Sequence, residues 1–142
     1  MFGTVVAPCD LEGSSDAGLR YAAEVARTGN GRLVVVHVLT SRAIDVADVP
    51  HRAAPLRQQA EERAMGTLEG MVAAVAAGLD TEIVVRFGDP AREIRRVADE
   101  HDAGVIVITV KNRSRVGKLL MGSQAQEIIL TSTRPVVCVP KP

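Results

Sequence analysis

The chain has few aromatic residues and no excess of charge of either sign. Its 142 residues include one tyrosine, two phenylalanines and no tryptophan, and 17 basic side chains balance 17 acidic ones. Proteins that stack single-stranded bases need several aromatic side chains, and proteins that coat nucleic acid need an excess of Lys and Arg. The composition therefore argues against both classes of nucleic-acid binding.

Cysteines and long apolar runs are also scarce. Cys9 and Cys138 are too few for a disulfide framework, and no run approaches the roughly 20 apolar residues of a membrane span. The first apolar run ends at Pro8 and lacks the basic start of a secretion signal. The three histidines have no cysteine or carboxylate at ligand spacing. We therefore expect a cytoplasmic protein without a metal site or a membrane partner.

The apolar content is enough for one core. Hydrophobic residues make up 46% of the chain and charged residues 24%, and we find no repeat, low-complexity stretch or linker. A domain of this length buries about 70% of the surface that its unfolded chain exposes. The sequence therefore predicts a single domain over residues 1–142.

Short β-branched runs alternate with longer segments of helical period. The runs occupy residues 4–7, 33–38, 82–87, 105–108 and 135–139. Most of them are continuously apolar, as expected of strands that are covered on both faces. The order predicts an α/β fold with a doubly wound, five-stranded parallel sheet and helices on both faces.

Four segments between these runs carry apolar residues at spacings of three and four. Their predicted buried faces lie within residues 19–26, 68–79, 94–98 and 125–129. The second helix is expected to follow a loop over about residues 40–54 and to end near Gly78. The third is expected to open at Asp89-Pro90, where an acid precedes a first-turn proline, and the fourth to follow Gly122-Ser123.

The segment after the fourth predicted strand is the best candidate for a ligand site. Open sheets of this kind bind ligands at the carboxyl ends of their strands. No acidic residue occurs between Asp102 and Glu127, whereas two lysines and two arginines, Arg113 among them, precede the last helix. A helix N-terminus favours anions, so this loop and helix suggest a phosphate site. A solvated basic loop is the alternative.

Three parts of the chain resemble the universal stress protein family. Residues 105–123, closing with 134–139, are similar to its C-terminal signature, and residues 5–15 to its first strand and turn. Gly88-Asp89-Pro90 resembles its third strand-to-helix junction, so the resemblance covers essentially the whole chain. It implies strand order 3-2-1-4-5 and a homodimer formed through Val137 and Val139 on the fifth strand. An edge covered by the chain's own loops is the alternative.

Nucleotide-binding members of this family carry G-x-x-G, nine further residues and then G-S or G-T after the fourth strand. Gly122-Ser123 matches the last pair, but Thr109 and Asn112 occupy the first two glycine positions. Asn tolerates left-handed backbone, whereas a β-branched residue does not. The resemblance therefore implies weakened binding of ATP or ADP, with Mg²⁺ only alongside nucleotide. A dimeric interaction module of the same fold that binds no nucleotide is the alternative.

The resemblance also assigns roles to single residues. Asp10, after Pro8, matches the acid that faces adenine and ribose, and Val38 lies where backbone contacts adenine. Ser123 matches the hydroxyl near the phosphates, and Arg113 belongs to the phosphate-side loop. Asp10 can instead stabilise a turn, and Ser123 has capping-box spacing to the glutamine three residues later.

Two further functional classes fit less well. A phosphoacceptor receiver domain would use Asp10, Asp89 and Thr109, but it needs paired acids after the first strand, and Cys9 precedes Asp10. A hydrolase would need a nucleophile beside a base or a G-K-S/T phosphate loop, and neither pattern occurs. We therefore expect a regulatory stress-response protein that is not an enzyme, with slow ATP hydrolysis at most incidental. The implied strand order separates Cys9 from Cys138 by two strand steps, so both are expected to be buried free thiols.

Overall fold

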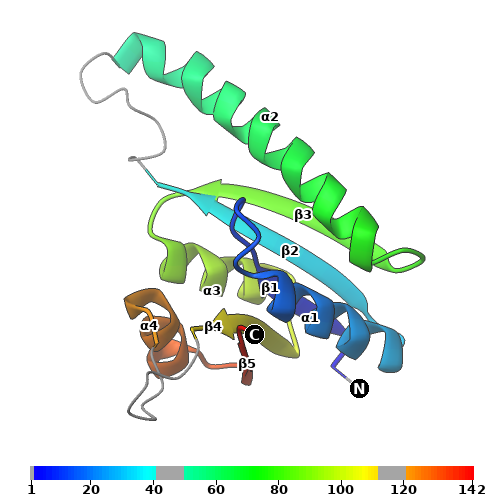
Figure 1. Ribbon diagram of the computed structural model, residues 1–142. Helices are drawn as coiled ribbons and strands as arrows, with labels where there is room; N and C mark the ends of the chain where they lie inside the picture. The colour runs from blue at the N-terminus through cyan, green and yellow to red at the C-terminus, as the bar shows by residue number, and fades with distance from the viewer. Residues whose placement is uncertain (1, 41–49, 112–120) are drawn as a thin grey trace.

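Strands and helices alternate along the chain as the sequence predicts (Figure 1). The computed structural model describes residues 2–40, 50–111 and 121–142. The strands are β1 (Thr4–Pro8), β2 (Arg32–Leu39), β3 (Asp80–Phe87), β4 (Val105–Val110) and β5 (Val136–Pro140). The helices are α1 (Asp16–Thr28), α2 (Pro50–Val75), α3 (Pro90–Glu100) and α4 (Ser123–Thr131). Each predicted strand lies within two residues of its predicted bounds.

The five strands form one parallel sheet in the order β3-β2-β1-β4-β5. β1 lies at its centre, where Val5 is opposite Leu33 of β2 on one side and Val105 of β4 on the other. The chain proceeds outward through β2 and β3, then returns past β1 to form β4 and β5. The strand order that the resemblance implied is therefore confirmed, and the order reverses between β1 and β4.

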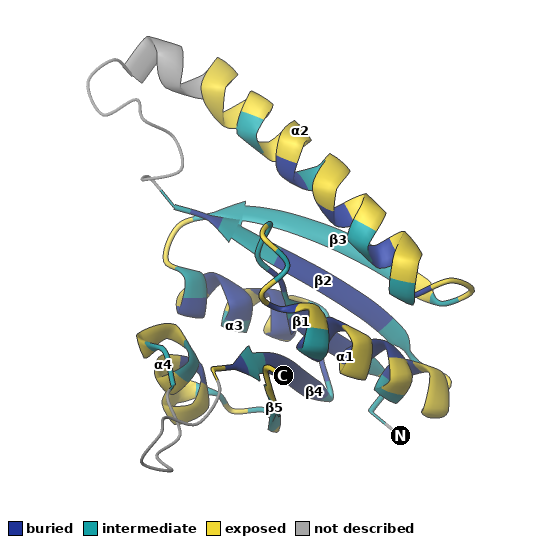
Figure 2. Cartoon of the chain, viewed as in Figure 1, coloured by how far each residue is buried: buried dark blue, intermediate teal, exposed yellow. Residues whose placement is uncertain are grey.

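Each face of the sheet is covered by a pair of helices. Alternate residues of β1 and β4 point to opposite faces, so Val5 and Val107 pack beneath α1 and α2, whereas Val6 and Ile106 pack beneath α3 and α4. Figure 2 shows β2 and β4 as mostly buried and the outer sides of the helices as exposed. This double cover explains why the strands read as continuous apolar runs.

The second helix differs from its prediction at both ends. α2 begins at Pro50, within the segment predicted as loop, and carries Pro55 inside it. A proline interrupts helical hydrogen bonding, so the helical turn that precedes Pro55 is not expected from local rules. The helix ends at Val75, three residues before the predicted stop, and Gly78 supplies the left-handed turn that follows, with φ of 80°.

The third helix begins as predicted. The Asp89 side chain accepts a hydrogen bond from the backbone N–H of Arg92 at 3.1 Å, and Pro90 occupies the first turn. Gly88, just before the cap, has φ of 140°, a conformation open to glycine but strained for other residues. The glycine, acid and proline therefore each have a separate backbone role in turning β3 into α3.

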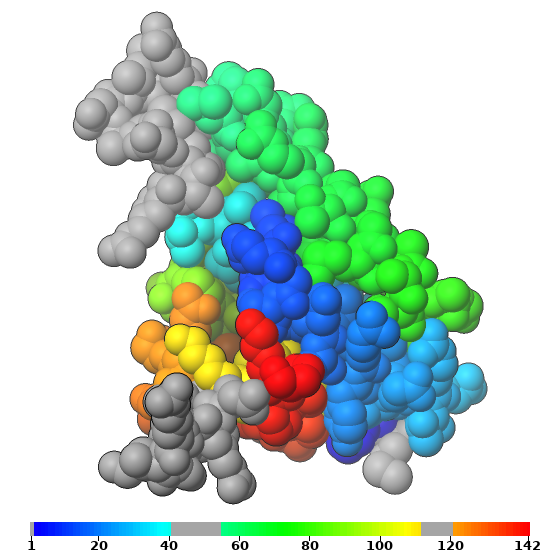
Figure 3. Space-filling model, viewed as in Figure 1, coloured from blue at the N-terminus to red at the C-terminus, as the bar shows by residue number. Residues whose placement is uncertain are grey.

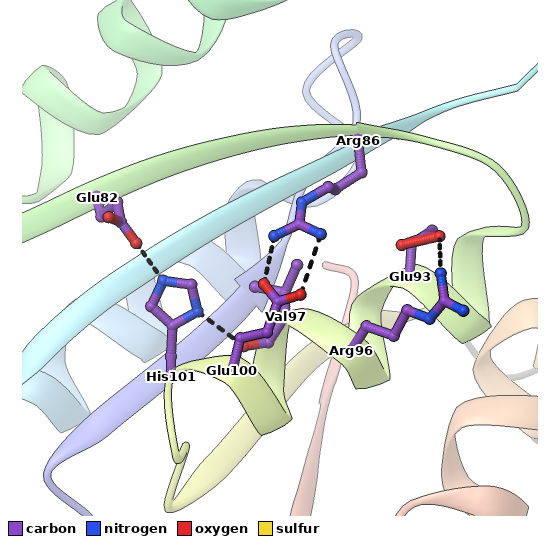
Figure 4. A network of polar contacts seen from close by, with 7 residues as sticks. All are labelled: Glu82, Arg86, Glu93, Arg96, Val97, Glu100 and His101. Carbon is purple, nitrogen blue, oxygen red and sulfur yellow. Dashed lines mark hydrogen bonds and ion pairs between the residues drawn. The ribbon is translucent and has the colours of Figure 1, made fainter.

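Polar side chains connect β3 to α3 on the surface of the sheet (Figure 4). Arg86 donates to both carboxylate oxygens of Glu100, which lowers the pKa of that carboxyl. His101 contacts the Glu82 carboxylate through Nε2 and the backbone oxygen of Val97 through Nδ1, at 2.8 Å in the second case. These contacts hold the end of α3 against the edge strand.

Thr109 fastens β4 to the first turn of α1. Its hydroxyl accepts a hydrogen bond from the N–H of Gly18 at 2.8 Å and donates one to the carbonyl of Ser15 at 3.2 Å. The Gly18 N–H is one of the first-turn donors that an α-helix cannot satisfy internally. A Cβ on Gly18 would lie 2.3 Å from Thr109 Oγ1, so only glycine allows this approach. Thr109 therefore has a role within the fold, which the sequence did not reveal.

Replacing this hydroxyl should destabilise the protein. Thr109→Val keeps the shape of the side chain but leaves the Gly18 N–H without its partner, and an unsatisfied buried donor costs about 1–3 kcal/mol. Thr109→Ser retains the hydroxyl and should cost less. Urea denaturation followed by circular dichroism measures both, and equal stability of the wild type and Thr109→Val would contradict this assignment.

The same contact predicts an unusual effect at Gly18. Alanine normally favours a helix over glycine by roughly 1 kcal/mol. Here Gly18→Ala should instead destabilise, because its Cβ overlaps the Thr109 hydroxyl. Adding Thr109→Ala should recover part of the loss, and a double-mutant cycle without such coupling would show that the two residues do not contact each other.

Candidate functional site

A cavity of about 260 Å³ lies at the carboxyl ends of β1, β2 and β4. It occupies the place where the strand order reverses, which is where open α/β sheets bind ligands. One part of its wall is apolar and comprises Val36, Val38, Ile94, Ile108 and Ile128. The polar part comprises Asp10, Ser14, Ser15, His37, Thr40, Thr109 and Gln124. A wall of this kind suits a ligand with a flat apolar part and a charged part.

Residues from the starts of α3 and α4, and from the turn before α1, line this cavity, but the three helix N-termini differ in their hydrogen bonding. At α1, the N–H of Gly18 is bonded to Thr109. At α3, the carboxylate of Asp89 accepts from the first turn. At α4, no side chain caps the helix, and within the described part of the chain no partner is found for the N–H groups of Ser123, Gln124 and Ala125. Of these three, α4 is therefore the N-terminus best able to receive an anion.

Asp10 organises the turn between β1 and α1. Its Oδ1 accepts hydrogen bonds from the N–H of Ser14 at 3.0 Å and from the hydroxyl of Ser15 at 3.3 Å. The Ser15 hydroxyl also accepts from the N–H of Asp10 at 2.8 Å. The turn-stabilising role considered for Asp10 is therefore present. Its second oxygen, Oδ2, has no partner among the described residues and remains able to accept a ligand hydroxyl.

His37 and Cys9 face each other at the ends of β2 and β1. The ring Nδ1 of His37 lies 2.7 Å from the carbonyl oxygen of Cys9, which can only accept, so Nδ1 carries the hydrogen. No hydrogen bond to Nε2 is found among the described residues. Cys9 is buried, and this burial raises the pKa of its thiol to about 12, so it stays protonated and unreactive at neutral pH.

The capping-box interpretation of Ser123 is wrong. Gly122 is the N-cap of α4, with extended backbone at φ of −67° and ψ of 159°, and its carbonyl accepts from the N–H of Gln126. Ser123 is the first residue of the helix, so the cap lies one position before the predicted one. Because glycine has no side chain to bond the first turn, no described residue caps the backbone donors at the start of α4.

The structure brings half of the predicted binding residues together. Pro8, Asp10, Val38 and Thr109 line the cavity, and Ser123 stands beside lining residue Gln124 at the start of α4. Asn112 and Arg113, with most of the basic loop, lie outside the described residues. His37, Thr40 and Gln124 also line the cavity but were not predicted as site residues. Their positions at the end of β2 and the start of α4 could have indicated them, because ligands bind at the carboxyl ends of the strands.

The cysteines are both free thiols, as predicted, but only Cys9 is fully buried. Cys138 is half-buried on the edge strand, so the expectation of two buried thiols is wrong for it. Among residues 2–40, 50–111 and 121–142, no cluster of three or more His, Cys, Asp or Glu side chains could hold a metal ion. The helices of that same part of the chain include none with the length and apolar character to cross a bilayer.

β5 forms one edge of the sheet. Val137 and Val139 lie on the face that α1 covers, whereas Val136 and Cys138 lie on the face of α3 and α4. These four residues are all only half-buried. Figure 3 shows the C-terminal segment, in red, on the surface of the molecule between α1 and the end of β4. An apolar edge strand of this kind is suited to pairing with another strand.

Comparison with known proteins identifies the family. The family model described as "Universal stress protein family" matches residues 1–140. Universal stress protein G of Salmonella typhimurium is 30% identical over 146 residues, which cover 98% of this chain and 99% of that protein. Its counterpart in Escherichia coli O157:H7 is 32% identical over 149 residues, with the same coverage of both chains.

Solved structures agree in fold. Universal stress protein MJ0577 of Methanocaldococcus jannaschii superimposes with a TM-score of 0.81 at 20% identity, covering all of this chain and 98% of that one. A universal stress protein from Archaeoglobus fulgidus gives 0.66 at 27% identity, covering 98% and 99%. A universal stress protein in complex with cAMP gives 0.62 at 23% identity, covering 99% and 98%. The strand order, the crevice at the reversal and the match along nearly the whole sequence lead to one conclusion: this chain belongs to the universal stress protein family.

Proposed function

We propose that this protein is a cytoplasmic regulatory member of its family, folded as one domain, that binds an adenine nucleotide in the cavity at the ends of β1, β2 and β4. The proposal rests on the N-terminus of α4, which no described residue caps and which lies beside a partly apolar cavity. The nucleotide's phosphates would lie against the N–H groups of Ser123, Gln124 and Ala125. Mg²⁺ would enter only with the nucleotide, held by its phosphates.

The rest of the cavity suits the other parts of the ligand. The valine and isoleucine side chains of β2, β4, α3 and α4 offer an apolar surface to the base. The free Oδ2 of Asp10 can accept a hydrogen bond from a ribose hydroxyl, because Oδ1 alone serves the turn. Structures of family members have been solved with cAMP and, for the Archaeoglobus fulgidus protein, with dAMP. Those two complexes support an adenine nucleotide as the ligand class here.

The hydrogen bonds of Thr109 support the proposal that the affinity for nucleotide is weakened. Glycine at this position would leave the first turn of α1 open as a second group of donors. The Thr109 hydroxyl occupies those donors, so α4 is left to hold the phosphates without help from α1. The proposed role is sensing and not hydrolysis, since the cavity wall pairs no serine hydroxyl with a histidine among the hydrogen bonds of the described residues.

We propose further that the protein forms a homodimer through β5. The edge presents Val137 and Val139 half-buried, and pairing with the same strand of a second copy would cover them. Pro135 and Pro140 lack an N–H and limit the pairing to the segment between them. If nucleotide binding fails, this dimer remains as an interaction module, the second candidate function.

Nucleotide binding is tested by placing a negative charge at the start of α4. Ser123→Asp should stabilise the helix by about 0.3–1 kcal/mol, because an acid at a helix N-terminus is favourable. The same charge should repel phosphate and weaken ATP binding at least about tenfold, since like charges at such a site oppose each other. Urea denaturation measures the stabilisation, and isothermal titration with ATP measures the loss of binding. Adenosine binding should change little because adenosine carries no phosphate.

The matched control is Ala74→Asp, which adds the same charge on the exposed side of α2. It should leave ATP binding unchanged. Absence of heat when the wild type is titrated with millimolar ATP or cAMP would refute nucleotide binding. Equal ATP affinity in Ser123→Asp and the wild type would show that the phosphates do not lie at α4.

The dimer is tested by a charge on β5. Val137→Lys would place two buried lysines in a two-fold interface, and we expect the dissociation constant of the dimer to rise at least about a hundredfold. Leu56→Lys, on the exposed part of α2, is the control and should remain dimeric. Light scattering coupled to size exclusion gives the mass, and a monomeric wild type or a dimeric Val137→Lys variant would count against the β5 interface.

A further inference from the structure

A second cavity, of about 310 Å³, lies between α3 and the turn that leads from α4 into β5. We call it the arginine cavity, because four of the residues that line it are arginines: Arg92, Arg95, Arg96 and Arg134. It shares no lining residue with the cavity at the strand ends. The wall also contains one acidic residue, Asp99, so the charged residues that line the cavity are mostly positive, although the chain has no net charge.

Helical spacing brings three of the arginines to one side of α3. Arg95 and Arg96 follow Arg92 by three and four residues, so each of them is a neighbour of Arg92 on the same side of the helix. The opposite side of α3 packs into the core through Ile94, Val97 and neighbouring alanines. Because the other face of α3 is buried in the core, the arginines of this helix point away from the core.

Acidic partners neutralise only half of these arginines. Arg96 pairs with Glu93 at 3.1 Å, and Arg134 pairs with Asp99 at 3.1 Å and Asp102 at 3.3 Å. Within residues 2–40, 50–111 and 121–142, no acidic side chain pairs with Arg92 or Arg95. Like charges at close range repel, so two unpaired guanidinium groups beside two paired ones favour an added anion.

Among the described residues, the hydrogen bonds at the end of α4 do not involve the guanidinium groups of Arg92 or Arg95. Carbonyl oxygens at a helix C-terminus attract cations, but two of those in the last turns of α4 already have donors. The hydroxyl of Thr131 donates to Glu127 O, and the N–H of Ser132 donates to Ile128 O at 2.9 Å. The guanidinium group of Arg134 donates a hydrogen bond to the backbone oxygen of Ala103, and this bond fixes the side chain of Arg134 in the wall of the cavity. The hydroxyl of Thr133 has no partner in the described part of the chain.

From this arrangement we infer that the arginine cavity binds a phosphate group. Guanidinium groups match the paired oxygens of phosphate, and Arg92 and Arg95 would supply the contacts while Thr133 adds a hydroxyl. The group can come from inorganic phosphate or pyrophosphate, or from a phosphate monoester. This binding is separate from the proposed nucleotide site, and it stands even if that site binds nothing.

The test is isothermal titration of the full-length protein with inorganic phosphate, pyrophosphate and glycerol 3-phosphate. The double variant Arg92→Gln with Arg95→Gln should weaken binding at least about tenfold, because both uncommitted cations are lost. Amide shifts in an NMR titration should include Ser132 and Thr133. Tighter binding of glycerol 3-phosphate would identify a monoester as the source, and tighter binding of pyrophosphate would identify an inorganic one.

The matched control is Arg20→Gln with Arg63→Gln, which removes two exposed arginines from α1 and α2 and changes the net charge equally. It should bind all three probes as the wild type does. All four substituted positions are exposed or half-buried, so each variant should retain the circular dichroism spectrum of the wild type. The inference is overturned if the wild type binds none of the probes at millimolar concentration, or if the control weakens binding as much as the double variant does.

Discussion

The reversal of strand order between β1 and β4 is the constraint on which the rest of this structure depends. Parallel strands need crossover helices, and burying both faces of the sheet requires helices on each side. Building outward from β1 in one direction and then in the other places α1 and α4, the helices that follow β1 and β4, on opposite faces of the sheet. Their separation opens the cavity at the strand ends, so the candidate site follows from the topology before any side chain is considered.

Side chains then decide what this cavity can accept. The first turns of α1 and α3 are occupied by Thr109 and Asp89, one through a neutral hydroxyl and the other through a carboxylate. Gly122 leaves the first turn of α4 without a side-chain cap. The N-terminus of α4 therefore differs from those of α1 and α3 in having no side-chain partner. We expect this difference to orient a bound ligand, with its anionic end toward α4 and its apolar end toward the sheet.

Much of the fold could be predicted from the sequence because strong, local patterns determine it. The β-branched runs gave all five strands, and Asp89-Pro90 gave the start of α3 with its capping acid. The start of α2 could not be predicted, because Pro55 is a helix breaker by local rules and yet stands inside that helix. The last strand was placed to within one residue because prolines bound it on both sides.

The candidate site was predictable in position but less so in detail. Asp10 follows β1 and Val38 lies near the carboxyl end of β2, so their meeting at one cavity follows from parallel pairing. The role of Thr109 depends on Gly18, which is 91 residues away, and no pattern in the sequence links the two. The excess of positive charge on α3 could not be predicted either. In the sequence each arginine is typical of a solvated helix, and only the structure shows which of them pair with acidic side chains.

We propose that an anionic ligand contacts the first turn of α4, which has no side-chain cap, and not the first turns of α1 or α3. Backbone amide chemical shifts report each of these groups separately. During a titration of the wild type with ATP, we expect the largest shifts at Ser123, Gln124 and Ala125, with small changes at Gly18 and Ala91. Shifts concentrated at Gly18 or Ala91, or no shifts at the start of α4 at saturating ATP, would contradict this proposal.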